Sequence, residues 1–255
     1  MSIDPNKIGK TFCPSPWVHF RLGANGQFTP CRWAVNSPGA STASTIYAET
    51  PLEFFHSDTM NRLRHDMVAG NANPICKTCL YEDSFGKLSG RQKQLFRFGL
   101  TVDASDKWTE VDTSIFEYSY EHGGQTNVEP IDFQIVTSNT CNSSCIMCGP
   151  GSSSKISKDL ATNSTLRELS GADFAYVEAW RLTDSAINRI VDDLETIPYI
   201  NYVHLIGGEP FYDKGVKKLM QLMVDRGIAK RVICGTATNA TIYDAELMDL
   251  MAQFQ

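Results

Sequence analysis

Three cysteines lie close together near the middle of the chain, at Cys141, Cys145 and Cys148. Their spacing is C-x3-C-x2-C, and no fourth cysteine follows nearby. An ordinary structural metal site is closed by four protein ligands, whereas three thiolates on a four-iron cluster leave one iron open to a small molecule. Two alternatives to such a cluster remain. One is a zinc site that a distant histidine completes, and the other is three buried thiols that bind no metal together.

The composition of the 255-residue chain is that of a globular protein. Its 42% hydrophobic and 10% aromatic residues can fill a core, which excludes a disordered chain. The net charge of −6 argues against a general nucleic-acid or membrane-surface binder. No apolar run approaches the roughly 20 residues of a membrane span, and the first residues lack a signal peptide's apolar core. We therefore expect a cytoplasmic protein with reduced thiols, which binds neither membranes nor nucleic acid.

The N-terminal part of the chain begins with a hairpin signal. Residues 17–21 and 27–31 predict two strands around an Asn25-Gly26 turn, because both central positions of a type I′ turn need positive φ. Residues 58–68 predict an amphipathic helix. We place one domain at residues 1–100 and a polar linker at 101–130.

From residue 131 to residue 255, strand and helix signals alternate. Buried strands are predicted at 131–136, 202–206 and 231–234, and helices at 184–194, 214–224 and 244–254. The order βαβαβα predicts an α/β fold with a parallel sheet and right-handed crossovers. Ligands of such folds bind beyond the carboxyl ends of the strands, where the cysteine run and Gly207-Gly-Glu-Pro210 both lie.

Three segments of this second region resemble those of the radical S-adenosylmethionine (SAM) enzymes. The three cysteines match that family's cluster loop after the first strand, and residues 207–210 match its GGEP motif after the second. Thr236-Ala-Thr-Asn239 looks like its Thr-Asn segment after the third strand. The resemblance implies a partial (β/α)6, TIM-like barrel, of which residues 131–255 supply the first three βα units. We expect the later strands to lie outside this chain.

The resemblance also implies an enzyme activity. Cys141, Cys145 and Cys148 would hold a [4Fe–4S] cluster with one open iron, and reductive cleavage of SAM would give a 5′-deoxyadenosyl radical. That radical would abstract hydrogen from a substrate, for which a peptide or protein is a candidate, with a reductase or flavodoxin-type protein as electron donor. The cofactor-binding residues implied are Gly207, Gly208, Glu209, Pro210, Met147, Thr238 and Asn239. Glu209 is the expected partner of the SAM ammonium group. Met147 stands where an aromatic residue often lies near adenine.

The N-terminal cysteines resemble those of the SPASM and shorter twitch domains of radical SAM enzymes, which bind auxiliary clusters. The four are Cys13, Cys31, Cys76 and Cys79. The additional cysteines of a full SPASM domain are missing, which favours a twitch domain. A hairpin and a turn can each bring two thiolates to one metal, so we expect a small α+β domain with one auxiliary [4Fe–4S] cluster. By ligand count, a structural zinc ion fits equally well.

A second function class is a non-catalytic iron–sulfur or zinc-binding protein on the same scaffold, which release of 5′-deoxyadenosine from SAM would exclude. Several other residues are given structural roles. Cys234 is expected to be a buried core thiol and His204 a packed histidine. A solvated helix face is expected for Lys87, Arg91, Lys93 and Arg97.

Overall fold

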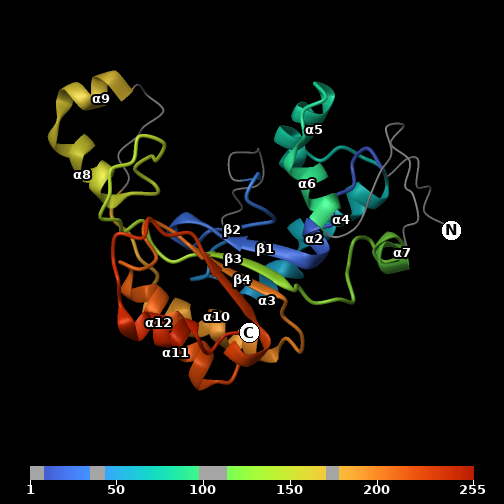
Figure 1. The fold of residues 1–255 in the computed structure, drawn as a ribbon. Coiled ribbons are helices and arrows are strands. Elements are labelled where there is room, and N and C mark those ends of the chain that lie inside the picture. Colours follow the sequence, from blue (N-terminus) through green and yellow to red (C-terminus); the bar gives the residue numbers. More distant parts are fainter. Residues whose placement is uncertain (1–8, 35–43, 98–113, 171–177) are drawn as a thin grey trace. The chain divides into compact units, whose positions relative to one another are not determined.

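The computed structural model describes residues 9–34, 44–97, 114–170 and 178–255 (Figure 1). The chain divides into two compact units. The first comprises the described parts of Met1–Arg21, Phe28–Ser44 and Pro51–Ile131. The second comprises Leu22–Gln27, Thr45–Thr50 and the described parts of Asp132–Gln255. None of the helices in these described ranges is long and apolar enough to cross a membrane.

The N-terminal part of the chain, up to residue 131, combines short helices with two short neighbouring strands. In chain order, the elements are α2 (Ser15–Val18), β1 (His19–Leu22), η1 (Ala24–Gly26), β2 (Phe28–Thr29), α3 (Pro51–Phe55), α4 (Asp58–Val68), η2 (Pro74–Cys76), α5 (Lys77–Ser84), α6 (Gly90–Arg97) and α7 (Ser114–Glu121).

The predicted hairpin is confirmed at its turn and shortened in its strands. Asn25 has φ of 55° and Gly26 has φ of 73°, so both central positions are left-handed, as expected. The prediction of a strand from residue 17 was wrong, because Pro14 and Pro16 preset the helical turn α2 and β1 begins only at His19. Strand β2 ends before Pro30, which cannot donate to a strand ladder.

Helix α4 spans the predicted residues and is capped by the Ser57 hydroxyl. It packs against α7, a helix within the expected linker at 101–130. Residues 101–113 lie outside the described residues. In α7, Phe116 packs edge-on against Phe12 at 4.3 Å between ring centroids, and Ser119 accepts a hydrogen bond from Trp17. The described part of the expected linker therefore contributes to the core of the first unit.

A buried arginine on α4 ties three helices of this unit together. Arg64 donates from Nε to the Pro16 carbonyl at 2.8 Å and from a terminal nitrogen to the Phe55 carbonyl at 2.6 Å. Its guanidinium also lies 4.5 Å from the Phe55 ring centroid. Burial lowers the pKa of Arg64 to about 9, so the side chain is still charged at neutral pH.

Replacement of Arg64 with alanine is expected to destabilise the protein by about 3–5 kcal/mol, because it leaves a void and two buried carbonyls without donors. The free energy of unfolding in urea measures this change. Arg62→Ala, at an exposed position of the same helix, is the matched control and should change the stability by less than about 0.5 kcal/mol. Equal effects of the two substitutions would contradict this role of Arg64.

The second unit is built on three parallel strands. From residue 132 onward, the elements are β3 (Asp132–Val136), α8 (Ser154–Thr162), α9 (Ser164–Ser170), α10 (Asp184–Thr196), β4 (Tyr202–Ile206), α11 (Lys214–Asp225), η3 (Ala229–Arg231), β5 (Ile233–Thr236) and α12 (Ala245–Met251). Phe133 of β3 pairs with Val203 of β4, which pairs in turn with Cys234 of β5. The predicted α/β fold with a parallel sheet is therefore confirmed in this unit.

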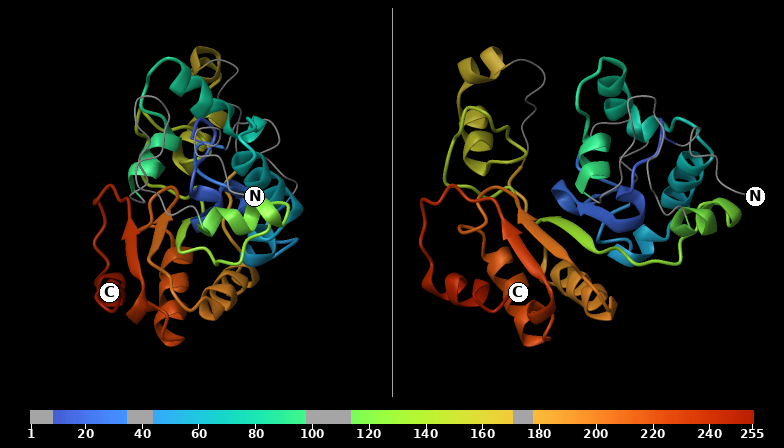
Figure 2. Two further views of the ribbon diagram at one scale, coloured as in Figure 1. Left: turned by 90° about the vertical axis from the view of Figure 1, so that its right-hand side faces the viewer. Right: turned by 45° about the vertical axis from the view of Figure 1, so that its right-hand side comes forward.

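Two of the amphipathic helices cover one face of this sheet. Helices α10 and α11 lie on the same side of β3 and β4 and pack against each other (Figures 1 and 2). Their buried side chains include Ile187, Ile190, Val191, Leu219 and Met223. On β4, buried and half-buried residues alternate, so that Val203 and Leu205 face the covered side.

Strand β5 begins two residues later than predicted. Residues Ala229–Arg231 form the 3-10 turn η3 instead of entering the strand. The guanidinium group of Arg231 donates to main-chain carbonyls at the end of α10, including that of Leu194 at 3.0 Å. This anchor holds the chain in the turn, and the strand starts after it. Cys234, expected to be buried in the core, is half-buried on β5, where burial raises its pKa to about 12.

Candidate functional site

The three central cysteines lie in the loop between β3 and α8, which we call the cysteine loop (residues 140–152). The Cys148 main-chain N–H donates to the Cys145 carbonyl at 3.0 Å, which makes a tight turn between them. Burial raises the pKa of Cys148, and its neighbours Cys145 and Cys141 raise it further. Cys141 and Cys145 therefore lie close enough to Cys148 to influence its thiol, and Cys145 is exposed.

Asn139 directly precedes this loop and also bonds to its other end. The side chain is fully buried, and Nδ2 donates to the carbonyls of Pro150 at 3.3 Å and Glu178 at 3.2 Å. Its Oδ1 accepts the Trp180 N–H at 2.9 Å, and its carbonyl accepts the Ser154 N–H at 2.7 Å. The sequence analysis missed this residue, because its partners are distant in the sequence.

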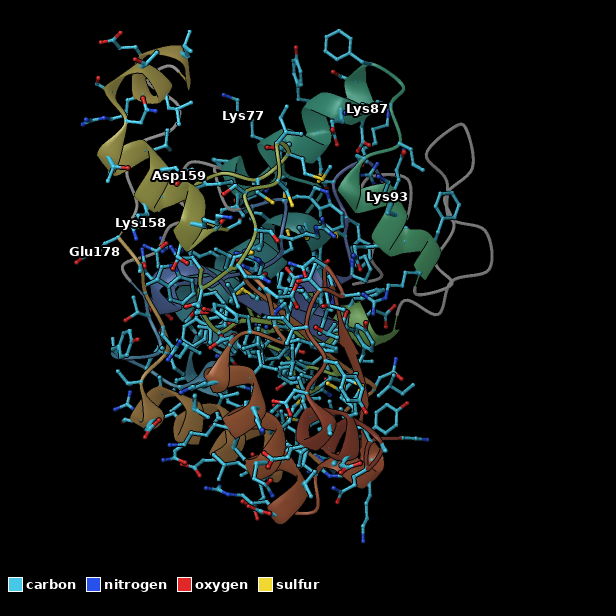
Figure 3. The ribbon with its side chains drawn as sticks, turned by 60° about the vertical axis from the view of Figure 1, so that its left-hand side comes forward. Lys77, Lys87, Lys93, Lys158, Asp159 and Glu178 are labelled. Carbon is cyan, nitrogen blue, oxygen red and sulfur yellow. The ribbon has the colours of Figure 1, made fainter. Side chains whose placement is uncertain are left out.

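The cysteine loop is also tied to the first turns of α8. Ser153 caps this helix by accepting the Ile156 N–H, and its hydroxyl donates to the Ser143 carbonyl at 2.7 Å. Farther along α8, Asp159 accepts a hydrogen bond from the Ser144 hydroxyl at 3.2 Å (Figure 3). The tip of the loop is open, because the Met147 side chain is 88% exposed.

The Gly207–Pro210 segment follows β4 and lies against the cysteine loop. Gly208 N–H donates to the Ser138 carbonyl at 3.0 Å, and Glu209 N–H donates to the Thr140 carbonyl at 2.9 Å. A Cβ atom on Gly207 would lie 2.6 Å from the Ser138 oxygen, and one on Gly208 would lie 2.2 Å from the Thr140 oxygen. We expected these glycines to permit close approach of a ligand. The structure gives another reason, the close approach of the chain's own backbone.

Glu209 is buried, and its carboxylate is held by the segment that follows β5. The Thr238 hydroxyl donates to Oε1 at 2.6 Å, and the Asn239 N–H donates to Oε2 at 2.7 Å. A third donor is the Phe211 N–H, at 3.0 Å from Oε1. The structure thus brings together the implied SAM-binding residues that follow the second and third strands.

Asp213, which the sequence analysis did not single out, joins the end of β3 to α11. It is buried, and its Oδ2 accepts hydrogen bonds from the hydroxyls of Thr137 and Ser138. Its Oδ1 caps α11 by accepting the Gly215 N–H at 2.8 Å and lies 3.3 Å from Nε of Arg181. This carboxylate therefore ties the end of β3, which leads into the cysteine loop, to the start of α11.

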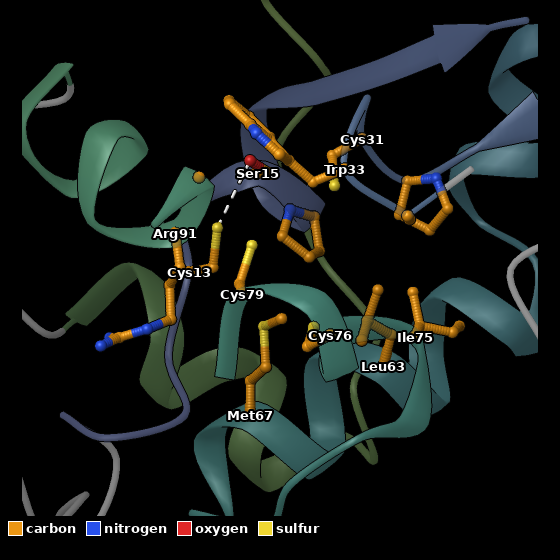
Figure 4. A pocket seen from close by; sticks show the side chains of 14 residues that line it. Cys13, Ser15, Cys31, Trp33, Leu63, Met67, Ile75, Cys76, Cys79 and Arg91 are labelled. Atoms are coloured by element: carbon orange, nitrogen blue, oxygen red, sulfur yellow. Dashed lines mark hydrogen bonds between the residues drawn. The ribbon is translucent and has the colours of Figure 1, made fainter. Parts of the chain in front are cut away.

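The four N-terminal cysteines line one cavity of about 30 Å³ in the first unit (Figure 4). Burial, with a smaller contribution from neighbouring thiols, raises the pKa of Cys31 to about 12 and that of Cys79 to about 11. The pKa values of Cys13 and Cys76 are also raised, mainly by burial. The structure therefore gathers these thiols around one space. In the described ranges, no group of three or more His, Cys, Asp or Glu side chains is arranged so that it could hold a metal ion.

The expectation of a solvated face for Arg91 was wrong. Arg91 is buried beside the cysteine cavity, where it pairs with Asp83 at 2.6 Å and donates to the Gly9 carbonyl at 2.9 Å. These acceptors replace the hydrogen bonds to water that the Arg91 guanidinium loses on burial. Lys87 and Lys93 are exposed, as predicted (Figure 3).

A comparison with protein-family models finds a match within the second unit. Residues 135–254 match the model of the Radical SAM superfamily. The matched region contains the cysteine loop, the Gly207–Pro210 segment and Asn239, whereas the N-terminal cysteines lie outside it. No curated protein and no solved structure matches the chain. Residues 135–254 therefore form a domain of the Radical SAM superfamily.

Proposed function

We propose that this chain is a radical SAM enzyme that binds a [4Fe–4S] cluster through Cys141, Cys145 and Cys148 and SAM beside Glu209. The observation that carries the proposal is the convergence of three segments at the carboxyl ends of β3, β4 and β5. The Gly207–Pro210 segment bonds to the start of the cysteine loop, and its carboxylate bonds to the segment after β5.

The donor chemistry at this site suits both groups. Thiolates are the ligands of iron–sulfur clusters, and three of them leave one iron without a protein ligand. When bound, the cluster and SAM would supply one-electron cleavage of a carbon–sulfur bond and a 5′-deoxyadenosyl radical that takes hydrogen from a substrate.

In this proposal, Glu209 binds the SAM ammonium group and orients it. Among the residues that the structure describes, the donors to its carboxylate are all neutral, namely the Thr238 hydroxyl and two main-chain N–H groups. A buried carboxylate gains most from a cationic partner, because charge-assisted hydrogen bonds are stronger than neutral ones. Thr238 and Asn239 keep its two oxygens fixed in place for that partner.

For the first unit we propose a twitch-type role, with one auxiliary [4Fe–4S] cluster on Cys13, Cys31, Cys76 and Cys79. The support is their shared cavity and the mutual effect of the thiols on their pKa values. Zinc is the second candidate, since four thiolates also suit that ion. For the enzyme as a whole, we propose a peptide or protein as substrate. The proposed electron donor is a reductase or a flavodoxin-type protein.

The test is SAM cleavage by the full chain, reconstituted without oxygen with iron and sulfide. We expect dithionite and SAM together to yield 5′-deoxyadenosine and methionine, detected by liquid chromatography and mass spectrometry. Omission of dithionite, or use of metal-free chain, should abolish both products. A chain that holds a reducible cluster but releases no 5′-deoxyadenosine would support the non-catalytic alternative instead.

A further inference from the structure

One residue after β5 contacts both the glutamate and the cysteine loop. The main-chain N–H of Asn239 donates to Glu209 at 2.7 Å. Its side-chain Nδ2 donates to Asn142 Oδ1 at 3.0 Å and to Ser143 Oγ at 3.1 Å. Asn142 and Ser143 lie between the first and second cysteines of the loop. Asn239 thus joins the carboxylate proposed to bind SAM to the loop proposed to bind the cluster.

A second residue closes this link into a ring. The Thr241 hydroxyl accepts a hydrogen bond from Asn142 Nδ2 at 2.8 Å and donates to Asn239 Oδ1 at 2.6 Å. The Thr241 main-chain N–H donates to the same Oδ1 at 3.0 Å. Asn239 and Thr241 are exposed, so hydrogen bonds rather than apolar burial hold this ring together.

The backbone between these two residues is strained. Ala240 has φ of 54°, in the left-handed region where a Cβ atom costs about 1–2 kcal/mol. Its N–H donates to the Thr238 hydroxyl at 3.0 Å, and that hydroxyl also donates to Glu209. Such strain persists only where surrounding contacts over-determine the conformation, and it clusters at functional sites.

The ring also reaches the sulfur atom of Cys141, a proposed ligand of the cluster. The Ser143 N–H donates to the Cys141 sulfur at 3.4 Å, and the Ser143 hydroxyl is a partner of Asn239. Hydrogen bonds to the thiolates of an iron–sulfur cluster tune its reduction potential. A movement of the Glu209 carboxylate would therefore shift Asn239. Through Asn239 it would shift Ser143, which donates a hydrogen bond to the Cys141 sulfur.

We infer that Asn239 is a positioning residue that couples occupancy of the Glu209 carboxylate to the cysteine loop. This role rests on the proposed binding of the cluster and SAM at the site. Binding of an ammonium group at Glu209 would fix the carboxylate, and with it the Asn239 main chain. The Asn239 side chain would then restrict Asn142 and Ser143, so that the cluster responds to SAM through the protein as well as directly.

Asn239→Ala tests this inference, because it retains the main-chain N–H to Glu209 and removes only the side-chain links. We expect its iron content to equal that of the parent chain and its dissociation constant for SAM to rise about three- to tenfold. The change that SAM causes in the electron paramagnetic resonance spectrum of the reduced cluster should become smaller. In the metal-free chain, hydrogen exchange of the amides in residues 141–148 should become faster.

Asn201→Ala is the matched control, an exposed asparagine just before β4. It should behave like the parent chain in every measurement. Unchanged hydrogen exchange in metal-free Asn239→Ala, or an unchanged spectral response to SAM, would overturn the coupling while leaving the proposed function intact. A parent chain that assembles no cluster or binds no SAM would overturn the proposed function itself, and the coupling with it.

Discussion

Simultaneous replacement of Cys141, Cys145 and Cys148 with alanine is expected to lower the iron content of the reconstituted chain from about eight atoms to about four. It should also abolish release of 5′-deoxyadenosine. The physical reason is that these thiols are the proposed ligands of one cluster, and the other four cysteines of the proposed ligand set lie around a separate cavity. Iron and sulfide assays on the anaerobically reconstituted chain measure the change. The fold should survive, because Asn139 and Ser153 anchor the loop through groups other than the sulfur atoms.

The control for this variant is Cys234→Ala, which removes a half-buried thiol from β5. Its iron content and SAM cleavage should match those of the parent chain. If the N-terminal cysteines hold zinc, the parent chain will contain about four irons and one zinc, and the triple variant only the zinc. Full iron retention in the triple variant would refute the assignment of the central cysteines.

The second large effect is expected for Gly208→Ala. The added Cβ would lie 2.2 Å from the Thr140 oxygen and 2.5 Å from the Thr140 carbonyl carbon. Both are main-chain atoms that cannot rotate away, so the Gly207–Pro210 segment and the cysteine loop must separate. We expect a loss of stability of about 1–3 kcal/mol. SAM affinity should fall more than tenfold, because the Glu209 N–H bond to Thr140 is lost together with the position of the carboxylate.

Gly151→Ala provides a matched control in the cysteine loop itself, since a Cβ atom there would meet nothing within 4 Å. Urea unfolding and SAM titration of the reconstituted proteins compare the two variants. Gly151→Ala should resemble the parent chain in both measurements. If Gly208→Ala bound SAM as tightly as Gly151→Ala does, the close contact of Gly208 with Thr140 would not be needed for SAM binding.

Elements that depend on local signals could be predicted from the sequence. Strand β4 lies at its predicted residues because a short apolar run is bounded by turn residues, and α4 does so because a serine cap precedes a clear apolar stripe. The Asn25–Gly26 turn followed from the φ requirement alone. Strand β5 was displaced because the bonds from Arg231 to the end of α10 depend on the tertiary structure.

The proposed ligands of the candidate site come from spacing and resemblance, whereas the residues that hold the surrounding loops in place could not be named in that way. Asn139 and Asp213 act through hydrogen bonds to partners far away in the sequence. Asn239 was named as a cofactor-binding residue, but its bonds to the cysteine loop depend on the tertiary structure. Arg91 was misjudged for the same reason, since a buried arginine and an exposed one look alike until the acceptors around them are known.

The contact of Gly207 and Gly208 with the chain's own backbone bears on how catalytically silent relatives could be recognised. These glycines are required by the packing of two loops, so a descendant that had lost all chemistry would still need them to fold. Glu209 differs from them, because a buried carboxylate whose donors in the described residues are all neutral is costly to keep. In a divergent sequence, the glycine pair would therefore indicate common ancestry of the fold. The glutamate beside it would indicate that the function of the site has been retained.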